Sequence, residues 1–330
     1  MAKAESTLVD VSDKGAFERK ASVFRNKIEE GGAHPPAAGR YILYVSYLCP
    51  WASRCIAVRK IKGLEPAIAM VVTSPQWAKT RPEADDHEGW VFDATFPGAT
   101  EEPHGLKTVR DVYDLSLRNS GVDPAAFLTR YTVPILFDNV SGVIVNNESS
   151  EIIRFFNDAF NAFAAHPEAN LAPAALLPAI DKVNDFIYES VCNGVYKCGF
   201  AQSQEAYDAA VTVLFNTLDE LDATLATQRY LTGGTPTESD IRLFVTLIRF
   251  DEVYAVHFKT NKKLIRDYVH LHQWLRDVYQ TLDLAPTVNM LHIKHGYYSS
   301  LSSLNRYGIV PVGPDVISDV ALPHNRDRTF

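Results

Sequence analysis

Residues 40–51 read RYILYVSYLCPW, and this stretch decides the fold of the first half of the chain. The aromatic and β-branched side chains up to Leu48 are typical of a buried strand. Pro50 ends that strand, because proline lacks the N–H of a sheet ladder but fits the first turn of a helix. We therefore expect Cys49 to lie between a strand and a helix.

The residues that follow extend this pattern into a βαβ unit. Residues 52–62 carry Ile56, Val58 and Ile61 among Arg and Lys and are followed by Gly63, which predicts a short helix that ends at the glycine. Residues 67–72, AIAMVV, predict a second buried strand. Strand, helix and strand in this order form a βαβ unit.

A long loop and a second group of elements come next. Residues 73–104 contain four prolines, and loops of this length inside a domain are often functional. Residues 106–117 predict a helix, with Leu106, Val109, Tyr113 and Leu117 at helical spacing. Residues 130–138 and 143–145 predict a strand hairpin, and 147–156 predict a helix with polar capping residues. The first half of the chain is therefore predicted to be α/β.

The second half is predicted to be helical from about residue 172 onward. Thr237 is followed three residues later by Asp240 and then by an apolar run, which is close to a capping box. Breakers in the sequence HPEANLAP place the boundary between the halves near residues 160–175.

We accordingly expect three parts. Residues 1–39 form an N-terminal arm, polar and irregular, with a short helix around 16–30. Residues 40–165 form the α/β domain, and residues 166–330 form the all-helical domain with the C-terminal tail.

Composition excludes several classes of function. The chain has 330 residues, of which 46% are hydrophobic, and a net charge of −8, so a nucleic-acid footprint is not expected. It has no stretch of about 18 apolar residues, so we expect no membrane span. The first 15 residues mix Lys with Glu and Asp and lack an apolar core, so we expect no targeting signal and a cytoplasmic protein.

The four cysteines are too few for a disulfide scaffold. They are Cys49, Cys55, Cys192 and Cys198, and no pair has the spacing of a zinc site. We expect no metal. Cys55 is predicted to lie in the core, and Cys192 and Cys198 to be structural. None of the three forms a CxxC motif with Cys49, so an external thiol must finish any thiol chemistry.

Cys49 is the candidate nucleophile. Pro50 keeps it out of the helical region of backbone space, so the thiol faces the positive end of the helix dipole. That position stabilises the thiolate and lowers its pKa, and Arg54 and Arg59 on the same helix are expected to add to this. The thiolate is the attacking species in thiol–disulfide exchange. An arbitrary cysteine is more often a small buried hydrophobe, but the strand–Cys-Pro–helix setting favours the nucleophile.

Two further pairs of residues are candidates for ligand binding. Val133-Pro134 marks an edge strand or a special turn, and a cis bond there would expose the backbone of Val133 to a ligand. Glu148-Ser149 opens a helix, whose N–H groups bind carboxylates, while Glu148 can hold an ammonium group. An edge-strand proline and simple helix capping are the alternatives.

Together these residues resemble a cytosolic glutathione transferase of the cysteine type, similar to the omega-like classes. More closely, the chain resembles the glutathionyl-hydroquinone reductases, or Xi-class glutathione transferases. The segments that carry this resemblance span most of the chain: YLCPWASR (47–54), GWVF (89–92), RYTVPILFDN (130–139), NNESSEIIR (146–154), NGVYKCGFAQSQEAYD (193–208), RFDEVYAVHFKTNKKLI (249–265) and HIKHGYYSS (292–300).

The resemblance implies a thioredoxin-like α/β N-terminal domain followed by an all-α C-terminal domain, the glutathione transferase fold. It makes Cys49 the nucleophile and glutathione the co-substrate. Glutathione would be held by Trp90, Arg130, Val133, Glu148 and Ser149. The acceptor would be bound by Tyr196, Tyr297 and Tyr254. Pro50, Pro134, Thr237 and Asp240 would be structural. We also expect a homodimer, the commonest oligomer.

The implied reaction removes glutathione from glutathionyl-hydroquinones or related aromatics through a Cys49–glutathione mixed disulfide. The alternatives are an omega-like thioltransferase or dehydroascorbate reductase, and a non-catalytic module that binds glutathione or phenols. The chain departs from the family's pattern at Ser53, Gly296, Leu301 and Arg306. These departures concern substrate preference rather than thiol chemistry.

Overall fold

The computed structural model describes residues 10–11, 17–18, 21–126 and 130–330. Within these residues the chain divides into two compact units, and we describe each by itself. Of the described residues, the first unit comprises 21–126, 130–169 and 291–309, and the second comprises 10–11, 17–18, 170–290 and 310–330. Residues 291–309 are therefore grouped with the first unit, although they follow most of the helical unit in sequence. The division into 1–39, 40–165 and 166–330 stays a prediction.

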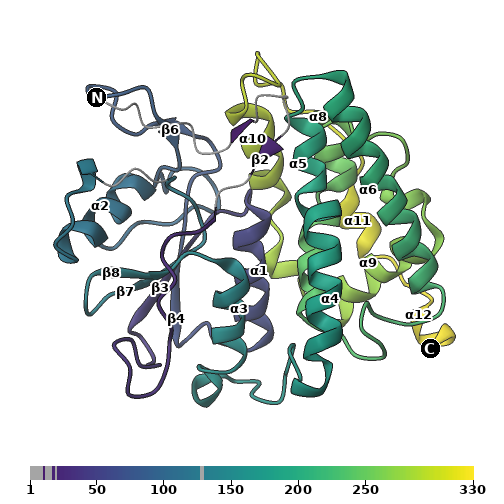
Figure 1. The fold of residues 1–330 in the computed structure, drawn as a ribbon, viewed down its shortest axis with the longest axis horizontal. Coiled ribbons are helices and arrows are strands. Elements are labelled where there is room, and N and C mark those ends of the chain that lie inside the picture. The colour runs from purple at the N-terminus through teal and green to yellow at the C-terminus, as the bar shows by residue number, and fades with distance from the viewer. Residues whose placement is uncertain (1–9, 12–16, 19–20, 127–129) are drawn as a thin grey trace. The chain divides into compact units, whose positions relative to one another are not determined.

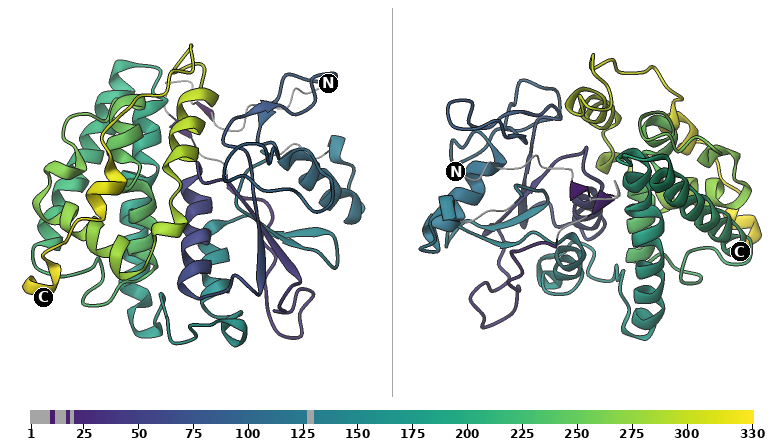
Figure 2. Two further views of the ribbon diagram at one scale, coloured as in Figure 1. Left: turned by 180° about the vertical axis from the view of Figure 1, so that it is seen from behind. Right: turned by 45° about the horizontal axis from the view of Figure 1, so that its top comes forward.

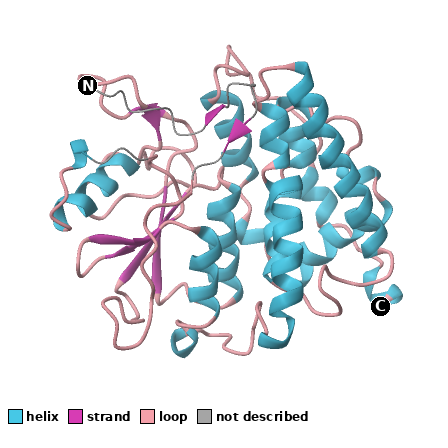
Figure 3. Ribbon diagram, in the orientation of Figure 1, coloured by secondary structure: helices cyan, strands magenta, loops and turns pink. Residues whose placement is uncertain are grey.

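The first unit is built on a four-stranded sheet with the order β4-β3-β7-β8 (Figure 1, Figure 3). The strands are β3 Tyr41–Val45, β4 Ile68–Val72, β7 Ile135–Asp138 and β8 Val143–Asn146. Strand β3 is parallel to β4 and antiparallel to β7, and β7 is antiparallel to β8. Every residue of β3 is buried, as expected for a central strand covered on both faces. The predicted βαβ unit and hairpin are confirmed.

Three helices cover this sheet, and each begins at a distinct cap. They are α1 Pro50–Ile61, α2 Val109–Asn119 and α3 Ser149–Asn157. Helices α1 and α3 lie side by side on one face of the sheet and α2 lies on the other (Figure 1, Figure 2). Cys49 is the N-cap of α1, Glu148 that of α3, and Thr108 forms a capping box with Asp111. The caps therefore fix where the chain turns from sheet to helix.

Short elements complete the first unit. A two-stranded ribbon inside the long loop joins β5 Ala78–Lys79 to β6 Glu88–Gly89, and 3-10 turns lie at η1 Pro124–Ala126 and η2 Asn161–Phe163. Helix α10, Met290–Ser300, lies beyond the N-terminal end of α1 (Figure 2). A Cβ at Gly296 of α10 would come within 2.8 Å of the Leu48 side chain, so the two segments are in close contact.

The part of the N-terminal arm from residue 21 runs beside β8 rather than forming a helix. Asn26 N donates to Val145 O at 3.0 Å, and Asn147 N donates to Phe24 O at 3.1 Å. The short helix predicted around residues 16–30 is therefore wrong over 21–30, because the backbone of residues 24–26 pairs with the sheet edge. Before residue 21, β1 Asp10–Val11 pairs with β2 Phe17–Glu18, so the predicted helix is also wrong at residues 17–18. Its residues 16, 19 and 20 lie outside the described residues.

The second unit is a helical bundle. Its α-helices are α4 Leu177–Ile187, α5 Gly194–Gly199, α6 Gln204–Leu225, α7 Glu238–Leu247, α8 Ala255–His257, α9 Val269–Thr281, α11 Val316–Val320 and α12 Arg326–Thr329. Shorter turns are η3 Ala174–Leu176, η6 Ile265–Asp267 and η7 Ala285–Thr287, and two π-helical turns are η4 Tyr188–Cys192 and η5 Phe250–Tyr254. An α/β unit and a helical unit confirm the predicted fold class.

Asp240 organises the centre of this bundle. Thr237 and Asp240 form a capping box at the start of α7. The buried carboxylate also accepts hydrogen bonds from Leu231 N at 3.0 Å and from the Trp274 indole at 2.9 Å. The cap therefore joins α7 to α9. Among the helices described, none combines the length and the apolar character that a membrane span needs.

Candidate functional site

Cys49 lies where the sequence predicts, at the N-cap of α1. Its backbone is extended, with φ −79° and ψ 116°, and Pro50 occupies the first helical position. The half-buried thiol donates to Val133 O at 3.4 Å. The first turn of α1 carries no acidic side chain. At this position the positive end of the helix dipole stabilises the negative charge of a thiolate.

The two arginines predicted to assist Cys49 differ in their positions. Arg54 is buried and donates to Ser149 Oγ at 3.4 Å, so it lies between the starts of α1 and α3. Arg59 donates to Ile68 O at 2.8 Å, in the last turn of α1. Ten residues of helix correspond to about 15 Å, so the prediction for Arg59 is wrong.

The other three cysteines are buried and unlinked. Cys55 Sγ lies 4.0 Å from Ser149 O, within the packing of α1 on α3. Burial raises the pKa of Cys198 to about 12, which keeps its thiol protonated. Cys192 contacts Arg242 O at 3.6 Å. Of the four cysteines, only Cys49 is both partly exposed and at the N-cap of a helix.

A buried tyrosine joins the Val133 segment to the Glu148 segment. The Val133-Pro134 bond is cis, and the residue before it, Thr132, accepts a hydrogen bond from the Tyr113 hydroxyl at 3.0 Å. The same hydroxyl accepts from Thr132 N at 3.2 Å and from Asn147 Nδ2 at 3.0 Å. Sequence reasoning placed Tyr113 only on an apolar helix face. Its polar tip on that face was the available signal, since buried tyrosine hydroxyls need partners.

Glu148 is an ionised carboxylate at the start of α3. Its Oε1 accepts from Ser150 N at 3.0 Å and from Ser150 Oγ at 2.9 Å, and its Oε2 accepts from Ser22 Oγ at 3.0 Å. Burial alone would raise the pKa of Glu148, but hydrogen bonds from Ser150 and Ser22 and the charge of Arg54 lower it below its usual range. The group therefore stays negative and attracts a cation. Ser149, the first residue of α3, is buried beside it.

Trp90 and Arg130 come from the loops that flank α2. Trp90 is 5% exposed and packs edge-to-face on Trp77 with ring centroids 5.2 Å apart. Its indole N–H has no hydrogen-bond partner among the described residues, and a buried donor of this kind is available to a ligand. Arg130 follows residues 127–129, which are not described, and its carbonyl accepts from Thr132 N at 3.1 Å.

The three tyrosines predicted to bind an acceptor fall in two units. Tyr297 lies in α10 of the first unit, next to Gly296, which packs against Leu48. Tyr196 and Tyr254 are buried in the second unit with ring centroids 6.1 Å apart. Tyr254 ends the π-helical turn η5, and Tyr196 follows the π-helical turn η4. Single π-helical turns are frequent at functional sites.

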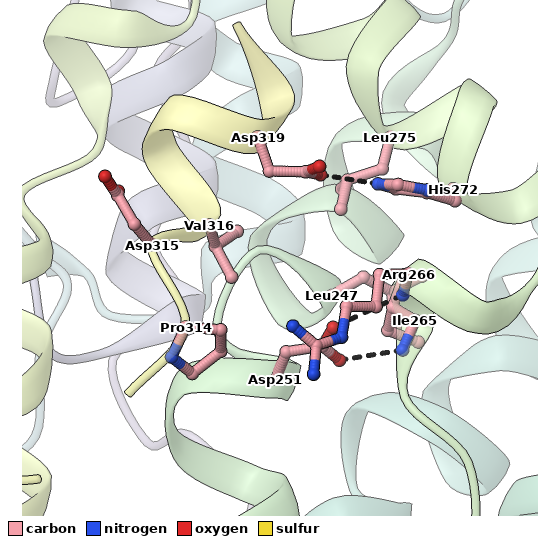
Figure 4. A pocket seen from close by; sticks show the side chains of 10 residues that line it. All are labelled: Leu247, Asp251, Ile265, Arg266, His272, Leu275, Pro314, Asp315, Val316 and Asp319. Atoms are coloured by element: carbon pink, nitrogen blue, oxygen red, sulfur yellow. Dashed lines mark hydrogen bonds and ion pairs between the residues drawn. The ribbon is translucent and has the colours of Figure 1, made fainter. Parts of the chain in front are cut away.

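A cavity of about 140 Å³ lies inside the second unit, between η5, η6, α9 and the tail segment with α11 (Figure 4). Its aspartate and histidine side chains are already engaged with the protein. Asp251 accepts from Ile265 N at 2.7 Å, and Asp319 pairs with His272. The contacts of Asp319 with α9 therefore anchor the tail segment at the cavity. Within the described parts of the chain, no cluster of His, Cys, Asp and Glu is arranged to hold a metal ion.

Comparison with known proteins adds to this geometry. The family model described as glutathione S-transferase, N-terminal domain, matches residues 48–159, and the one described as glutathione S-transferase, C-terminal domain, matches residues 204–277. Glutathionyl-hydroquinone reductase YqjG of Escherichia coli is 45% identical over 327 residues, which cover 97% of this chain and 94% of YqjG.

Solved structures agree with these matches. The glutathione-S-transferase Xi of Phanerochaete chrysosporium is 47% identical with a TM-score of 0.84, covering 93% of this chain and all of the other. The glutathione-bound structure of YqjG from Escherichia coli is 42% identical with a TM-score of 0.84, covering 98% and 99%. The similarity therefore extends over both units.

Proposed function

Because the chain belongs to the glutathione S-transferase family, within its Xi class, we propose that it is a glutathionyl-hydroquinone reductase. The observation that carries the proposal is the half-buried Cys49 thiol at the N-cap of α1, 3.4 Å from Val133 O. A cysteine in this position reacts as a nucleophile, whereas a conjugating transferase needs a hydroxyl that leaves the glutathione thiolate free. Glutathione is the co-substrate.

Glutathione is held by groups that line the first unit. Val133 pairs its backbone with the cysteinyl residue of glutathione, which brings the sulfur to Cys49. Glu148 binds the γ-glutamyl ammonium, and Ser149 with the N-terminus of α3 binds the γ-glutamyl carboxylate. The Trp90 indole N–H and the Arg130 guanidinium supply donors to the rest of the peptide. Two of these groups, the negative Glu148 and the Trp90 N–H, are complementary to a zwitterionic peptide.

The reaction takes place in two steps. The Cys49 thiolate attacks the sulfur of the glutathionyl-hydroquinone, the sulfur–carbon bond breaks, and the ring carbon takes a proton to give the free hydroquinone. Cys49 and glutathione are left as a mixed disulfide. A second glutathione thiolate attacks that disulfide, which releases oxidised glutathione and restores Cys49. Overall the aromatic carbon is reduced by two electrons, and two sulfur atoms are oxidised to the disulfide: the thioether sulfur of the substrate and the thiol sulfur of the second glutathione.

Proton transfer to the leaving ring is the task of the tyrosines. We assign Tyr196, Tyr254 and Tyr297 to binding the phenolic oxygen of the acceptor, since a tyrosine hydroxyl both donates and accepts a hydrogen bond. The buried ring cluster around Tyr196 and Tyr254 provides an apolar setting for an aromatic substrate. We also propose that the protein is a cytoplasmic homodimer, which sedimentation and cell fractionation would test.

The experiment measures hydroquinone released from a glutathionyl-hydroquinone in excess glutathione. Native chain, Cys49→Ala and Cys55→Ala are compared, and Cys55 is the matched control because it lies on the same helix but away from the N-cap. Turnover that is lost in Cys49→Ala and retained in Cys55→Ala supports the proposal. A native chain that binds glutathione without turning over this substrate, yet reduces dehydroascorbate or a mixed disulfide, would replace it with the omega-like activity. Binding without any turnover would leave a non-catalytic module.

A further inference from the structure

The N-terminal arm contributes a side chain to the start of α3. Residues 22–26, which we call the arm strand, lie against the outer edge of β8. Phe24 N donates to Asn147 Oδ1 at 3.1 Å, and Asn146 Nδ2 donates to Asn26 O at 3.1 Å. These bonds come in addition to the two backbone pairs between the same segments. The arm strand is therefore fixed in register at the point where β8 leads into Glu148.

Side-chain contacts hold the arm strand in the same place. The Arg25 guanidinium forms a bidentate pair with Glu151 in the first turn of α3, with Nε 2.8 Å from Oε2. The Phe24 ring packs edge-to-face on Tyr113 with centroids 5.6 Å apart. Tyr113 is the residue that joins the Val133 and Glu148 segments. The arm strand is thus anchored to the parts that build the glutathione site.

The Ser22 hydroxyl is presented to Glu148 by this register. Its Oγ lies 3.0 Å from Glu148 Oε2 and 3.3 Å from Asn147 O. A hydroxyl has a single proton, and the carboxylate is both closer and charged, so Ser22 donates to Glu148. Two lone pairs of the Ser22 oxygen then remain as acceptors beside the carboxylate.

We propose that Ser22 belongs to the binding site for the γ-glutamyl ammonium of glutathione, as a second acceptor next to Glu148. This inference rests on the proposed function, because it assumes that Glu148 meets that ammonium. An ammonium group has three N–H donors, and one carboxylate oxygen satisfies one of them. Two acceptors 3.0 Å apart can both reach a single nitrogen at hydrogen-bond distance. The hydroxyl also directs the carboxylate by donating to it.

The arrangement explains why the arm is built into the fold here. The Ser22 donor and the two Ser150 donors occupy three positions on the Glu148 carboxylate among the described residues. A carboxylate offers about four lone-pair positions. One position on Oε2 therefore remains for a ligand cation, and its direction is set by the donors already in place. The arm strand thus places Ser22 so that a small cationic group can bind between its Oγ and Glu148 Oε2.

The test compares glutathione with glutaryl-cysteinyl-glycine, which is glutathione without its α-amino group. Dissociation constants are measured by calorimetry for the native chain and for Ser22→Ala, Ser22→Thr and Val23→Ala. Val23 is the matched control, because its side chain is 52% exposed on the same arm strand. We expect Ser22→Ala to weaken glutathione about 3- to 10-fold. Glutaryl-cysteinyl-glycine should bind Ser22→Ala and the native chain equally, and Ser22→Thr should retain the native preference.

Other outcomes overturn the inference in distinguishable ways. Equal losses for both ligands in Ser22→Ala would show that Ser22 only supports the fold of the arm. Unchanged glutathione binding in Ser22→Ala, with native turnover present, would refute the role of Ser22 and leave the proposed function standing. A native chain that fails to bind glutathione would refute both. A loss in Val23→Ala as large as in Ser22→Ala would assign the effect to the arm backbone.

Discussion

Replacing Tyr113 with phenylalanine removes one hydroxyl from the centre of the first unit and leaves the ring packing intact. That hydroxyl donates to Thr132 O at 3.0 Å and accepts from Thr132 N at 3.2 Å and from Asn147 Nδ2 at 3.0 Å. Thr132 is partly exposed and finds water in the variant, whereas Asn147 is buried and does not. A buried group left without its partner costs about 1–3 kcal/mol. We therefore expect Tyr113→Phe to lower the free energy of unfolding by about 2 kcal/mol.

The same change should weaken glutathione binding, because Thr132 precedes Val133 and Asn147 precedes Glu148. The assay is urea unfolding of the native chain, Tyr113→Phe and the control Tyr307→Phe, together with KM for glutathione. Tyr307 is 79% exposed, so its hydroxyl should contribute less than about 0.5 kcal/mol. A stability loss below about 0.5 kcal/mol in Tyr113→Phe, with KM unchanged, would refute the view that this hydroxyl joins the two segments.

Three further outcomes are expected. Burial lowers the pKa of His87 to about 4, so only the unfolded chain takes up this proton between pH about 6.5 and 4. The free energy of unfolding should therefore fall by about 3 kcal/mol as the pH is lowered over that range. Urea midpoints measured at several pH values should lose this part of their pH dependence in His87→Gln. Gly296→Ala places a Cβ 2.8 Å from Leu48, so turnover should slow and the melting temperature should drop, whereas a gain in both would contradict the packing. Asp240→Ala leaves buried donors, among them the Trp274 indole N–H, without an acceptor. It should lower the free energy of unfolding, measured in urea, by at least about 3 kcal/mol.

The elements around Cys49 could be predicted because their signals are local. An apolar strand, a Cys-Pro junction and a short helix that ends at Gly63 lie within residues 40–72. They define the βαβ unit and place the thiol at a helix N-terminus. The capping pattern at Thr237 is equally local, since its partner is three residues away. The prediction for Arg59 failed because it considered only that Arg59 and Cys49 share a helix. Arg59 is ten positions from the N-cap and therefore lies at the other end of α1.

The partners of Glu148 could not be predicted. Ser22 is 126 residues away and belongs to a polar segment without strand alternation, so nothing local indicates that it pairs with a sheet edge. The predicted helix in that region failed for the same reason, because the backbone of residues 24–26 pairs with a distant strand. Tyr113 was placed correctly on a buried helix face, but the role of its hydroxyl depends on two loops that only the fold brings together.

The measurement that tests the central claim most directly is a single-turnover experiment without free glutathione. The native chain is mixed with one equivalent of a glutathionyl-hydroquinone, and intact mass and peptide mapping follow the protein while released hydroquinone is quantified. We predict one hydroquinone released per chain and one glutathionyl group attached to Cys49, removed on addition of glutathione. Hydroquinone released without any adduct, or an adduct on Cys55, Cys192 or Cys198 instead, would contradict Cys49 as the nucleophile.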